Sequence, residues 1–216
     1  MPADSAPSAR TQVRRLPQRG AYDRATLDAI LDAAFICHVG FVADGHPVVI
    51  PTGYGRRGDH LYIHGSAASH MLHSLQAGIE LCLTVTLLDG LVLARSVFHH
   101  SVNYRSVVVF GRATVVEEAS AKLRALEAIT DHILAGRWAA ARPPSPRELK
   151  ATLVLELPLA EASAKIRTGP PSDEPEDYAL PVWAGVVPAA LTFGEPLADP
   201  KLTPGIAMPA HVRGRS

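Results

Sequence analysis

Residues 99–111 read His-His-Ser-Val-Asn-Tyr-Arg-Ser-Val-Val-Val-Phe-Gly, a polar stretch that runs directly into an apolar one. The apolar part, Val107–Phe110, is rich in β-branched and aromatic residues, which favour strands. It predicts the longest strand of the chain, continuing through Ala113–Val116, with Gly111 as a bulge or a point of close backbone approach. The polar part then precedes this strand and stands at the rim of a sheet.

The polar part of this stretch carries groups suited to a phosphorylated, planar ligand. Arg105 offers a forked guanidinium that matches a phosphate. Asn103 and Ser106 can form hydrogen bonds with the polar edge of a ring. The alternative is that these side chains only cap a hairpin, since a loop beside a strand commonly carries an arginine.

A second stretch, Leu61 to His70, ends an expected strand in a turn of small residues that opens a helix. Small residues there let backbone N–H groups approach an anion, assisted by the helix dipole. Ser69 and His70 lie on the first helical turn. An ordinary turn without a ligand remains the alternative.

The rest of the chain predicts short strands and helices in alternation. Asp23 precedes an amphipathic helix that leads into a strand at Phe35–Val42. Asp44-Gly45 and Asp89-Gly90 are turn dipeptides that predict hairpins. Further strands are expected at 48–50, 60–64, 79–88, 91–97, 152–157 and 163–166, and further helices at 66–77 and 120–135. Six or seven strands with two or three short helices predict a mainly β fold, an antiparallel barrel that is closed or nearly closed.

At 216 residues the chain fits one domain of ordinary size with added terminal segments. Residues 1–19 contain several prolines and basic residues without apolar periodicity and are expected to form a flexible N-terminal arm. Residues 20–170 are expected to form the barrel. Residues 171–216 are rich in Pro and Gly, with Trp183 as the one large anchor, and are expected to pack as an extension on the barrel or on a partner subunit.

The composition separates this chain from several classes of protein. Its 47% hydrophobic and 19% charged residues are typical of a globular protein, and no apolar run is long enough to span a membrane. The 21 basic and 21 acidic residues balance, so no overall field attracts nucleic acid. Cys37 and Cys82 lack metal-ligand spacing, and the N-terminus has no signal-peptide pattern. A reduced, cytoplasmic setting is expected.

Motifs for two other kinds of site are absent from the sequence. There is no Gly-x-Ser-x-Gly elbow of a serine hydrolase, and neither His-Glu-x-x-His nor Cys-x-x-Cys occurs. His70 and His73 share one helix face, but no acidic residue or cysteine accompanies them at motif spacing. We therefore expect no metal-ion site built from side chains alone.

Five stretches stand in a recognisable order and spacing. They are Ile50-Pro51-Thr52, Leu61-Tyr62-Ile63-His64-Gly65, Val102 to Gly111, Lys165-Ile166-Arg167 and Trp183-Ala184-Gly185-Val186. Over about residues 19–188 the chain resembles the flavin-binding branch of the pyridoxamine-phosphate-oxidase-like split β-barrels that includes nitroimidazole-resistance proteins. The resemblance implies an antiparallel split β-barrel that works as a homodimer and holds FMN in clefts between the subunits.

The resemblance also implies which residues surround the flavin. Pro51 and Thr52 should flank the isoalloxazine ring, and His64 should border it as a proton donor or substrate contact, or only pack against it. His70 stands where relatives often have Arg or Lys, and its charge depends on its surroundings. The full set of expected cofactor-binding residues is Pro51, Thr52, Ile63, His64, Gly65, Ser69, His70, Asn103, Tyr104, Arg105, Ser106 and Trp183.

Two functions follow from this resemblance. The first is a flavin-dependent oxidoreductase that passes electrons to a small planar acceptor, with His64 as its catalytic candidate. The second is a flavin-binding or sensing module without catalysis. In either case FAD, a deazaflavin or haem can stand in place of FMN, since related split barrels use these cofactors. True pyridoxamine-phosphate oxidase activity is disfavoured because the Arg-rich C-terminal segment of that enzyme is missing.

Overall fold

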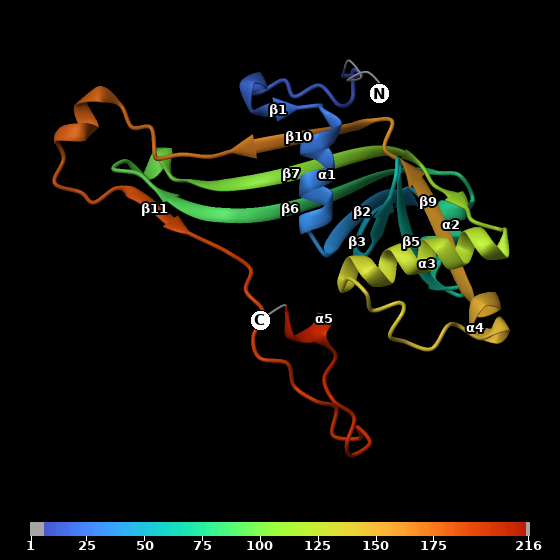
Figure 1. The fold of residues 1–216 in the computed structure, drawn as a ribbon. Helices are drawn as coiled ribbons and strands as arrows, with labels where there is room; N and C mark the ends of the chain where they lie inside the picture. Colours follow the sequence, from blue (N-terminus) through green and yellow to red (C-terminus); the bar gives the residue numbers. More distant parts are fainter. Residues whose placement is uncertain (1–6, 215–216) are drawn as a thin grey trace.

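The computed structural model describes residues 7–214 and consists of two antiparallel sheets flanked by short helices (Figure 1). The strands are β1 (Gly20–Ala21), β2 (Ile36–Ala43), β3 (His46–Gly53), β4 (Gly55–Arg57), β5 (His60–Ser66), β6 (Glu80–Leu93), β7 (Ser101–Arg112), β8 (Thr114–Val115), β9 (Thr152–Pro158), β10 (Ala162–Arg167) and β11 (Gly185–Pro188). The helices are α1 (Arg24–Ala33), α2 (His70–Gln76), α3 (Ala119–Ile133), α4 (Pro146–Ala151) and α5 (Ala210–Arg213), with single 3₁₀ segments at η1 (Pro17–Arg19), η2 (Val97–His99) and η3 (Pro175–Ala179).

The strands are divided unequally between the two sheets. One sheet has the order β1-β10-β7-β6-β2-β3, with β11 added to β6, and the other has the order β4-β5-β9-β8. Each strand pair is antiparallel. The chain is therefore mainly β, and the split β-barrel predicted from the sequence is confirmed.

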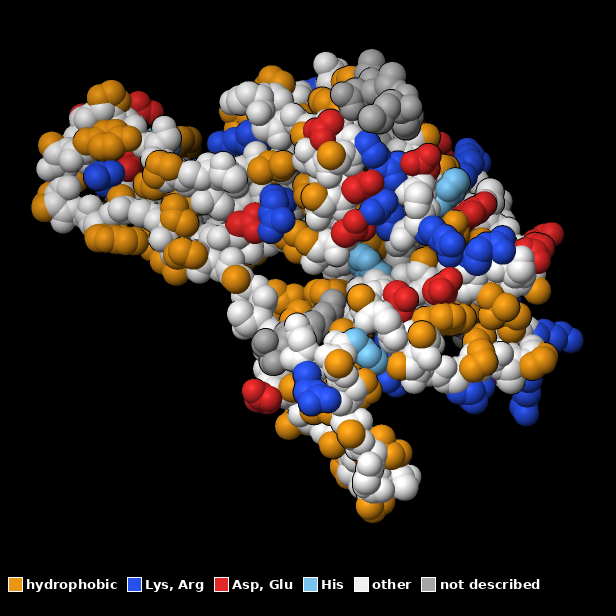
Figure 2. Space-filling view, viewed as in Figure 1, with side chains coloured by type: hydrophobic (Ala, Val, Ile, Leu, Met, Phe, Trp, Pro, Cys, Tyr) orange, Lys and Arg blue, Asp and Glu red, His pale blue; other side chains and the backbone are white. Residues whose placement is uncertain are grey.

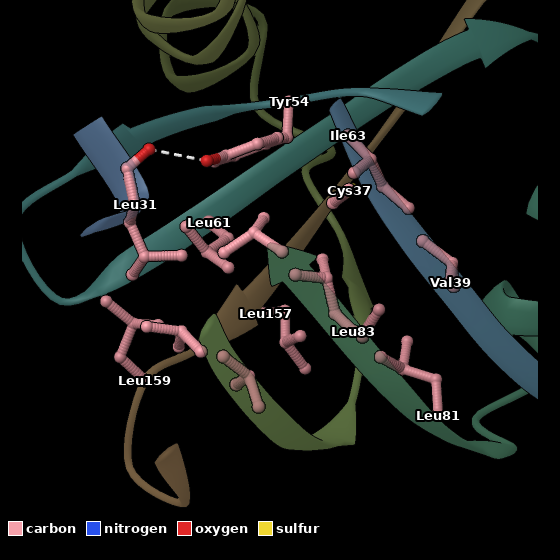
Figure 3. Close-up of a cluster of buried hydrophobic side chains, with 14 of the residues drawn as sticks. Leu31, Cys37, Val39, Tyr54, Leu61, Ile63, Leu81, Leu83, Leu157 and Leu159 are labelled. Atoms are coloured by element: carbon pink, nitrogen blue, oxygen red, sulfur yellow. Dashed lines mark hydrogen bonds between the residues drawn. The ribbon is translucent and has the colours of Figure 1, made fainter. Parts of the chain in front are cut away.

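The core fills the space between the two sheets (Figure 3). Val39 and Leu83 from the larger sheet are buried together with Leu61 and Leu155 from the smaller one. Tyr54 at the junction is fully buried, and its hydroxyl donates to the carbonyl oxygens of Leu31 and Ala34. Burial of the apolar faces of two sheets against each other is what holds such a barrel together.

The first helix forms as the sequence predicts. The Asp23 carboxylate accepts a hydrogen bond from the Thr26 amide at 2.8 Å and so caps α1. Leu27, Ile30 and Leu31 are the buried residues of this helix. They pack into the core because their spacing puts them on one face.

Helix α3 docks directly on the backbone of β4. A Cβ added to Gly55 would lie 2.5 Å from the Ile129 amide nitrogen and 2.6 Å from the Ala128 carbonyl carbon. Contacts that short leave no room for any side chain, so Gly55 sets the distance between the strand and the helix. Ala125 and Ile129 are the buried residues of α3.

The hairpin expected at Asp89-Gly90 was wrong. β6 continues through this dipeptide to Leu93, and the register with β7 shifts between Leu88 and Gly90. Asp89 is the extra residue of a β-bulge, a feature that uses the same turn-forming residues without reversing the chain. The chain turns instead at residues 94–100, which include η2.

The prediction that the polar stretch before Val107 precedes the strand was also wrong. β7 begins at Ser101, so the polar residues lie within the strand and not ahead of it. The strand ends at Arg112, and the residues after Ala113 form β8 in the other sheet. The predicted single strand through Val116 is therefore two strands that link the sheets.

The larger sheet extends well beyond the barrel as a ribbon, seen at the left of Figure 1. We call residues 85–106 and 166–188 the ribbon, and its end, residues 94–100 and 168–184, the ribbon tip. β2 pairs with β6 only from Leu81 to Thr84, and β11 takes up the same edge of β6 from Gly90 to Leu93. β11 was not predicted from the sequence, because the Pro-rich tail around it masks a four-residue strand.

Both chain ends run along the surface of the fold. In the N-terminal arm, of which residues 7–19 are described, Arg10 pairs with Glu80 at 3.2 Å and with Glu161, and its guanidinium lies 5.5 Å from the Phe110 ring. After β11, Phe193 stacks edge-on against Phe35, with ring centroids 5.6 Å apart. This ring contact joins the C-terminal extension to the barrel, and no second sheet forms in its described part.

Candidate functional site

The predicted cofactor-binding residues fall into two groups in the structure. The barrel group lies on β3, β5 and the start of α2 and consists of Pro51, Thr52, Ile63, His64, Gly65, Ser69 and His70. The ribbon group lies on β7 and at the ribbon tip and consists of Asn103, Tyr104, Arg105, Ser106 and Trp183.

The barrel group surrounds an open edge of the larger sheet. β3 is the last strand of that sheet, and Pro51 on it pairs with His38 of β2 and is exposed. Proline suits an edge strand because it has no N–H to donate. Ile63, in contrast, is 5% exposed and belongs to the core, so its side chain supports the site from beneath.

His64 lies next to this edge on β5, paired with Val154 of β9. Its surface is exposed, yet burial lowers the pKa of its imidazole below the usual value of 6.5. Protein atoms therefore surround part of the imidazole, while the rest of it faces solvent. The imidazole is therefore neutral at pH 7, with one nitrogen able to donate and the other to accept.

The small-residue turn after β5 differs from the expectation. Its amides are already engaged: Ala67 N donates to Ala151 O at 3.0 Å, Ala68 N to Ser66 Oγ at 3.1 Å, and Ser69 N to Ser66 O at 2.9 Å. The Ser69 side chain in turn caps α2 by accepting from Leu72 N at 3.5 Å. An anion at this turn would meet the Ser69 and His70 side chains and the first amides of α2, which have no intrahelical acceptor.

Arg105 has a partner of its own within the ribbon. Its guanidinium donates from Nε to Asp89 Oδ2 at 2.9 Å and from Nη2 to Asp89 Oδ1 at 2.7 Å, and this pairing raises its pKa. The bulge places the carboxylate there, because Asp89 is the residue that the bulge adds to β6. Nη1 of Arg105 forms no hydrogen bond with the described residues. A pocket of about 550 Å³ between this pair, Leu87 and Leu191 leaves that nitrogen accessible.

Asn103 and Arg167 join the strands of the ribbon at its outer end. Arg167 is 7% exposed and donates to the Asn103 side-chain oxygen and to the carbonyl oxygens of Gly169 and Pro170. Burial lowers the pKa of its guanidinium, and the charge of nearby Arg19 adds to that effect. Sequence reasoning gave Arg167 no role, although the Lys165-Ile166-Arg167 stretch contained it. A buried arginine can be found from sequence only when its strand pairing is known.

Trp183 is 66% exposed and therefore does not anchor the C-terminal extension, contrary to the expectation. Its ring lies over Gly185, whose added Cβ would come within 3.0 Å of it. Gly185 pairs with Leu93, nine residues along β6 from the barrel pairing at Thr84. At about 3.3 Å per residue this is about 30 Å. Within one chain, Trp183 and His64 cannot contact the same ring system.

The sequence profile described as pyridoxamine 5'-phosphate oxidase matches residues 23–166. The chain belongs to this family. The match spans the barrel from the cap of α1 to the end of β10. No curated protein matches the chain.

Three solved structures define what the chain is similar to. The flavocytochrome Anf3 from Azotobacter vinelandii is 43% identical, with a TM-score of 0.92 over 98% of this chain and 98% of that one. An FAD and haem binding protein from Mycobacterium smegmatis is 42% identical, with a TM-score of 0.88 over 92% of this chain and 97% of that one. A protein assigned to 5-nitroimidazole antibiotic resistance from Bacteroides thetaiotaomicron is 24% identical, with a TM-score of 0.58 over 68% of this chain and 86% of that one, and shows the fold alone.

Two further observations concern the described residues 7–214. None of their helices is long and apolar enough to cross a membrane. They contain no group of three or more His, Cys, Asp or Glu side chains placed to hold a metal ion. Both cysteines are free thiols, and burial raises the pKa of Cys37 to about 12.

Proposed function

We propose that this protein is a redox protein that binds a flavin, in the form of FAD, together with haem. One observation carries this proposal. The two relatives above 40% identity match 98% and 92% of the chain, and both are flavin and haem proteins by name. The relative linked to nitroimidazole resistance matches only 68% of the chain. The additional segments of this chain are thus shared with the proteins that carry two cofactors.

The barrel group fits the redox-active ring of a flavin. Thr52 and Ser69 offer hydroxyl groups, and His64 offers a neutral imidazole on an exposed side chain. Thr52 and His64 would contact the ring edge, and Ser69 and His70 would lie towards the phosphate. FMN, which the sequence favoured, and FAD share these parts, so the same residues serve either cofactor.

A haem needs an imidazole that is neutral and accessible, since only the unprotonated nitrogen binds iron. His64 is assigned to the flavin, so another of the ten histidines would bind the iron. Exposed apolar side chains along the ribbon and β3 supply surface of the kind that a porphyrin covers. The chain's residues therefore fit a haem as well as a flavin. When bound, the pair would supply the transfer of electrons between a two-electron and a one-electron carrier.

The protein's own contribution is orientation, hydrogen bonding and proton transfer. His64 can donate a proton from one ring nitrogen at the edge of the bound ring and recover it from solvent, because its side chain is exposed. Pro51 and Ile63 shape the floor of the site. The acceptor is a small planar molecule, and the protein acts as a homodimer in the cytoplasm.

The second candidate function is a flavin-binding module without catalysis. The rate at which the reduced protein reoxidises separates the two functions. We expect an added quinone or nitroaromatic compound to reoxidise the reduced protein faster than dissolved oxygen alone does. Equal rates with and without the added acceptor would support the binding module and contradict the proposed oxidoreductase.

A further inference from the structure

Three cationic side chains near the end of β10 have no acidic partner. Lys165 and Arg167 belong to β10, and Arg19 directly precedes Gly20, which pairs with Lys165. None of the ion pairs within the described residues involves any of the three. We call Arg19, Lys165 and Arg167 the cationic cluster. Positive charges held together without a counter-charge repel one another, so a bound anion would stabilise the folded chain.

Arg167 is the deeply buried member of the cationic cluster. Only 7% of its surface is exposed, and its guanidinium donates to the side-chain oxygen of Asn103 and to the carbonyl oxygens of Gly169 and Pro170. These acceptors are neutral, so they satisfy hydrogen bonds without balancing the charge. A buried arginine ordinarily has an acid as its partner, because an uncompensated charge is costly away from water. Arg167 therefore favours an anion at this place.

Arg19 lies close enough to Arg167 for the two charges to repel each other. Burial lowers the pKa of the Arg167 guanidinium, and the charge of Arg19 lowers it further. A like charge has this effect because it disfavours the protonated form. An anion bound between the two arginines would replace this repulsion by attraction to both.

The strand register places a free hydroxyl group beside the cationic cluster. Lys165 pairs with Ser106, and Arg167 pairs with Tyr104. Paired residues share one face of a sheet, as do alternate residues along a strand, so these four residues lie on the same face. The Tyr104 hydroxyl forms no hydrogen bond within the described part of the chain, and it can donate one to an oxyanion.

This face is not the one that carries Arg105. Arg105 pairs with Ile166, which stands between Lys165 and Arg167, and side chains alternate between the two faces along a strand. The carboxylate of Asp89 binds Arg105 and forms no ion pair with the cationic cluster. The cluster is therefore separate from the pair that was considered for the phosphate of the flavin.

We propose that Arg19, Lys165 and Arg167 bind the oxyanion group of a small molecule, a phosphate or a carboxylate, at a site separate from the cofactors. A guanidinium binds such a group through parallel hydrogen bonds, and an ammonium group adds a point charge. The ligand carries at least two negative charges, because three cations have to be balanced. Arg19 and Arg167 both lie outside residues 23–166, the part of the chain that the family profile matches. The site therefore does not rest on the proposed function.

The surroundings of the cationic cluster favour a small ligand over a polyanion. Hydrophobic side chains predominate on the face of the ribbon that Figure 2 shows, and charged side chains are few there. A nucleic acid needs a longer track of basic groups along its backbone. The 21 basic and 21 acidic residues of the chain also balance, so no overall field attracts a polyanion.

Isothermal titration with pyrophosphate tests the site on the full chain, with the cofactors that the protein carries after purification. Arg19→Gln and Lys165→Gln each remove one charge from a partly exposed side chain and leave Arg167 in place. We expect each variant to raise the dissociation constant of pyrophosphate about tenfold, the usual effect of losing one charge-assisted contact.

Two further variants show whether the effect comes from charge at this site. Arg19→Lys keeps the charge and should keep most of the affinity that Arg19→Gln loses. Arg147→Gln removes an exposed arginine from α4 and should leave the affinity unchanged. A parent protein that does not bind pyrophosphate, or equal affinities of the parent, Arg19→Gln and Lys165→Gln, would overturn the proposal.

The absorption spectrum, followed during the same titration, shows whether the oxyanion belongs to a free ligand or to a cofactor. We expect pyrophosphate to bind while any flavin and haem stay on the protein. Release of flavin or haem in step with binding would mean that pyrophosphate displaces a group of the cofactor, and would overturn a separate site. Binding of pyrophosphate by a protein that carries neither cofactor would support this inference and count against the proposed function alone.

Discussion

Arg105 and Asp89 face each other across the β6–β7 ladder and form two parallel hydrogen bonds, of 2.9 and 2.7 Å. The pair exists because the bulge in β6 adds Asp89 opposite a strand residue that would otherwise project into open space. The Asp89 carboxylate offsets the charge of the Arg105 guanidinium but accepts hydrogen bonds from only two of its three nitrogens. The residue that best matched a phosphate in the sequence is thus also part of the frame of the ribbon.

Arg105→Ala is expected to weaken the binding of a phosphorylated flavin about tenfold. Loss of one charge-assisted hydrogen bond from Nη1 costs about 1.5 kcal/mol, the lower end of the usual range, because Asp89 offsets part of the charge. Isothermal titration with FAD, FMN and riboflavin measures the effect, with Arg112→Ala as an exposed control on the same strand. An equal loss of riboflavin affinity would mean that Arg105 does not contact the phosphate.

We expect the ribbon tip to become less stable in acid, because protonation of Asp173 weakens the hydrogen bonds that hold it. Burial alone would raise the pKa of this carboxyl, but hydrogen bonds from Arg95 and Ser96 outweigh it and hold the pKa below its ordinary value of 3.8. The stabilisation is therefore complete above about pH 3.8 and is lost as the pH falls through the lowered pKa. We expect limited proteolysis by pepsin to cut residues 168–184 with increasing speed below that pH.

The variant Asp173→Ala should remove this dependence on pH. Its tip should be cut quickly at every pH tested, since the amides of Arg95 and Ser96 lose their acceptor. Glu176→Ala, three residues away and exposed, is the matched control and should behave as the parent does. A parent ribbon tip that pepsin cuts equally fast on both sides of the lowered pKa, relative to an unfolded substrate, would contradict the role of Asp173.

Gly55→Ala is expected to destabilise the barrel by about 3 kcal/mol or more, because the added methyl group would meet the backbone of α3 at 2.5 Å. Backbone atoms cannot move aside as a flexible side chain can. Gly53→Ala, two residues earlier, meets no atom within 4 Å and is the control. Denaturant unfolding measures both. Similar stabilities for the two variants would show that α3 is not held at the distance that the structure gives.

His64→Ala should separate cofactor binding from chemistry. If the imidazole donates a proton at the flavin ring, the variant keeps its flavin but reoxidises with a quinone about 10²-fold more slowly. His60→Ala, at the other end of the same strand, is the control. Flavin occupancy is measured before the rate. Unchanged occupancy with an unchanged rate would remove His64 from the mechanism.

The burial of His64 also sets an expected pH dependence. Because its pKa lies below 6.5, the neutral form predominates above that pH and the cationic form appears only as the pH falls further. The contribution of the neutral His64 side chain to the free energy of unfolding is complete above pH 6.5. It declines as the pH falls from 6.5 through the lowered pKa of the folded protein. In the parent protein the reoxidation rate should change with pH below pH 6.5. His64→Ala should remove that change and should also lower the rate above pH 6.5.

Periodicity and composition predicted the barrel well because its elements carry local signals. The cap at Asp23, the alternation in β2 and the helix ended by Gly78 all depend on residues close in sequence. The hairpin predicted at Asp89-Gly90 was wrong because that signal is also local. A turn and a bulge require similar backbone angles, and only the pairing partner decides between them. Here β7 pairs on both sides of the dipeptide, so the strand continues.

The candidate site was predicted only in part, because its members depend on contacts between distant segments. Arg167 reaches Asn103 across 64 positions of the chain, and no local pattern announces such a pair. Trp183 was interpreted as an anchor because large aromatic residues are usually buried, yet its side chain is mostly exposed. The barrel group around His64 stays a prediction; its members come from β3, β5 and α2, which follow one another in the sequence.

The absorption spectrum of the freshly purified protein tests the central proposal most directly. We expect flavin bands and a haem Soret band in the same spectrum. The flavin released on denaturation should be FAD. When haem is supplied during expression, each chain should carry about one of each cofactor. Reduction should bleach the flavin and shift the haem bands in the same sample. A protein that carries FMN alone, or that binds neither cofactor when both are supplied, would contradict the proposal that this chain is a flavin and haem redox protein.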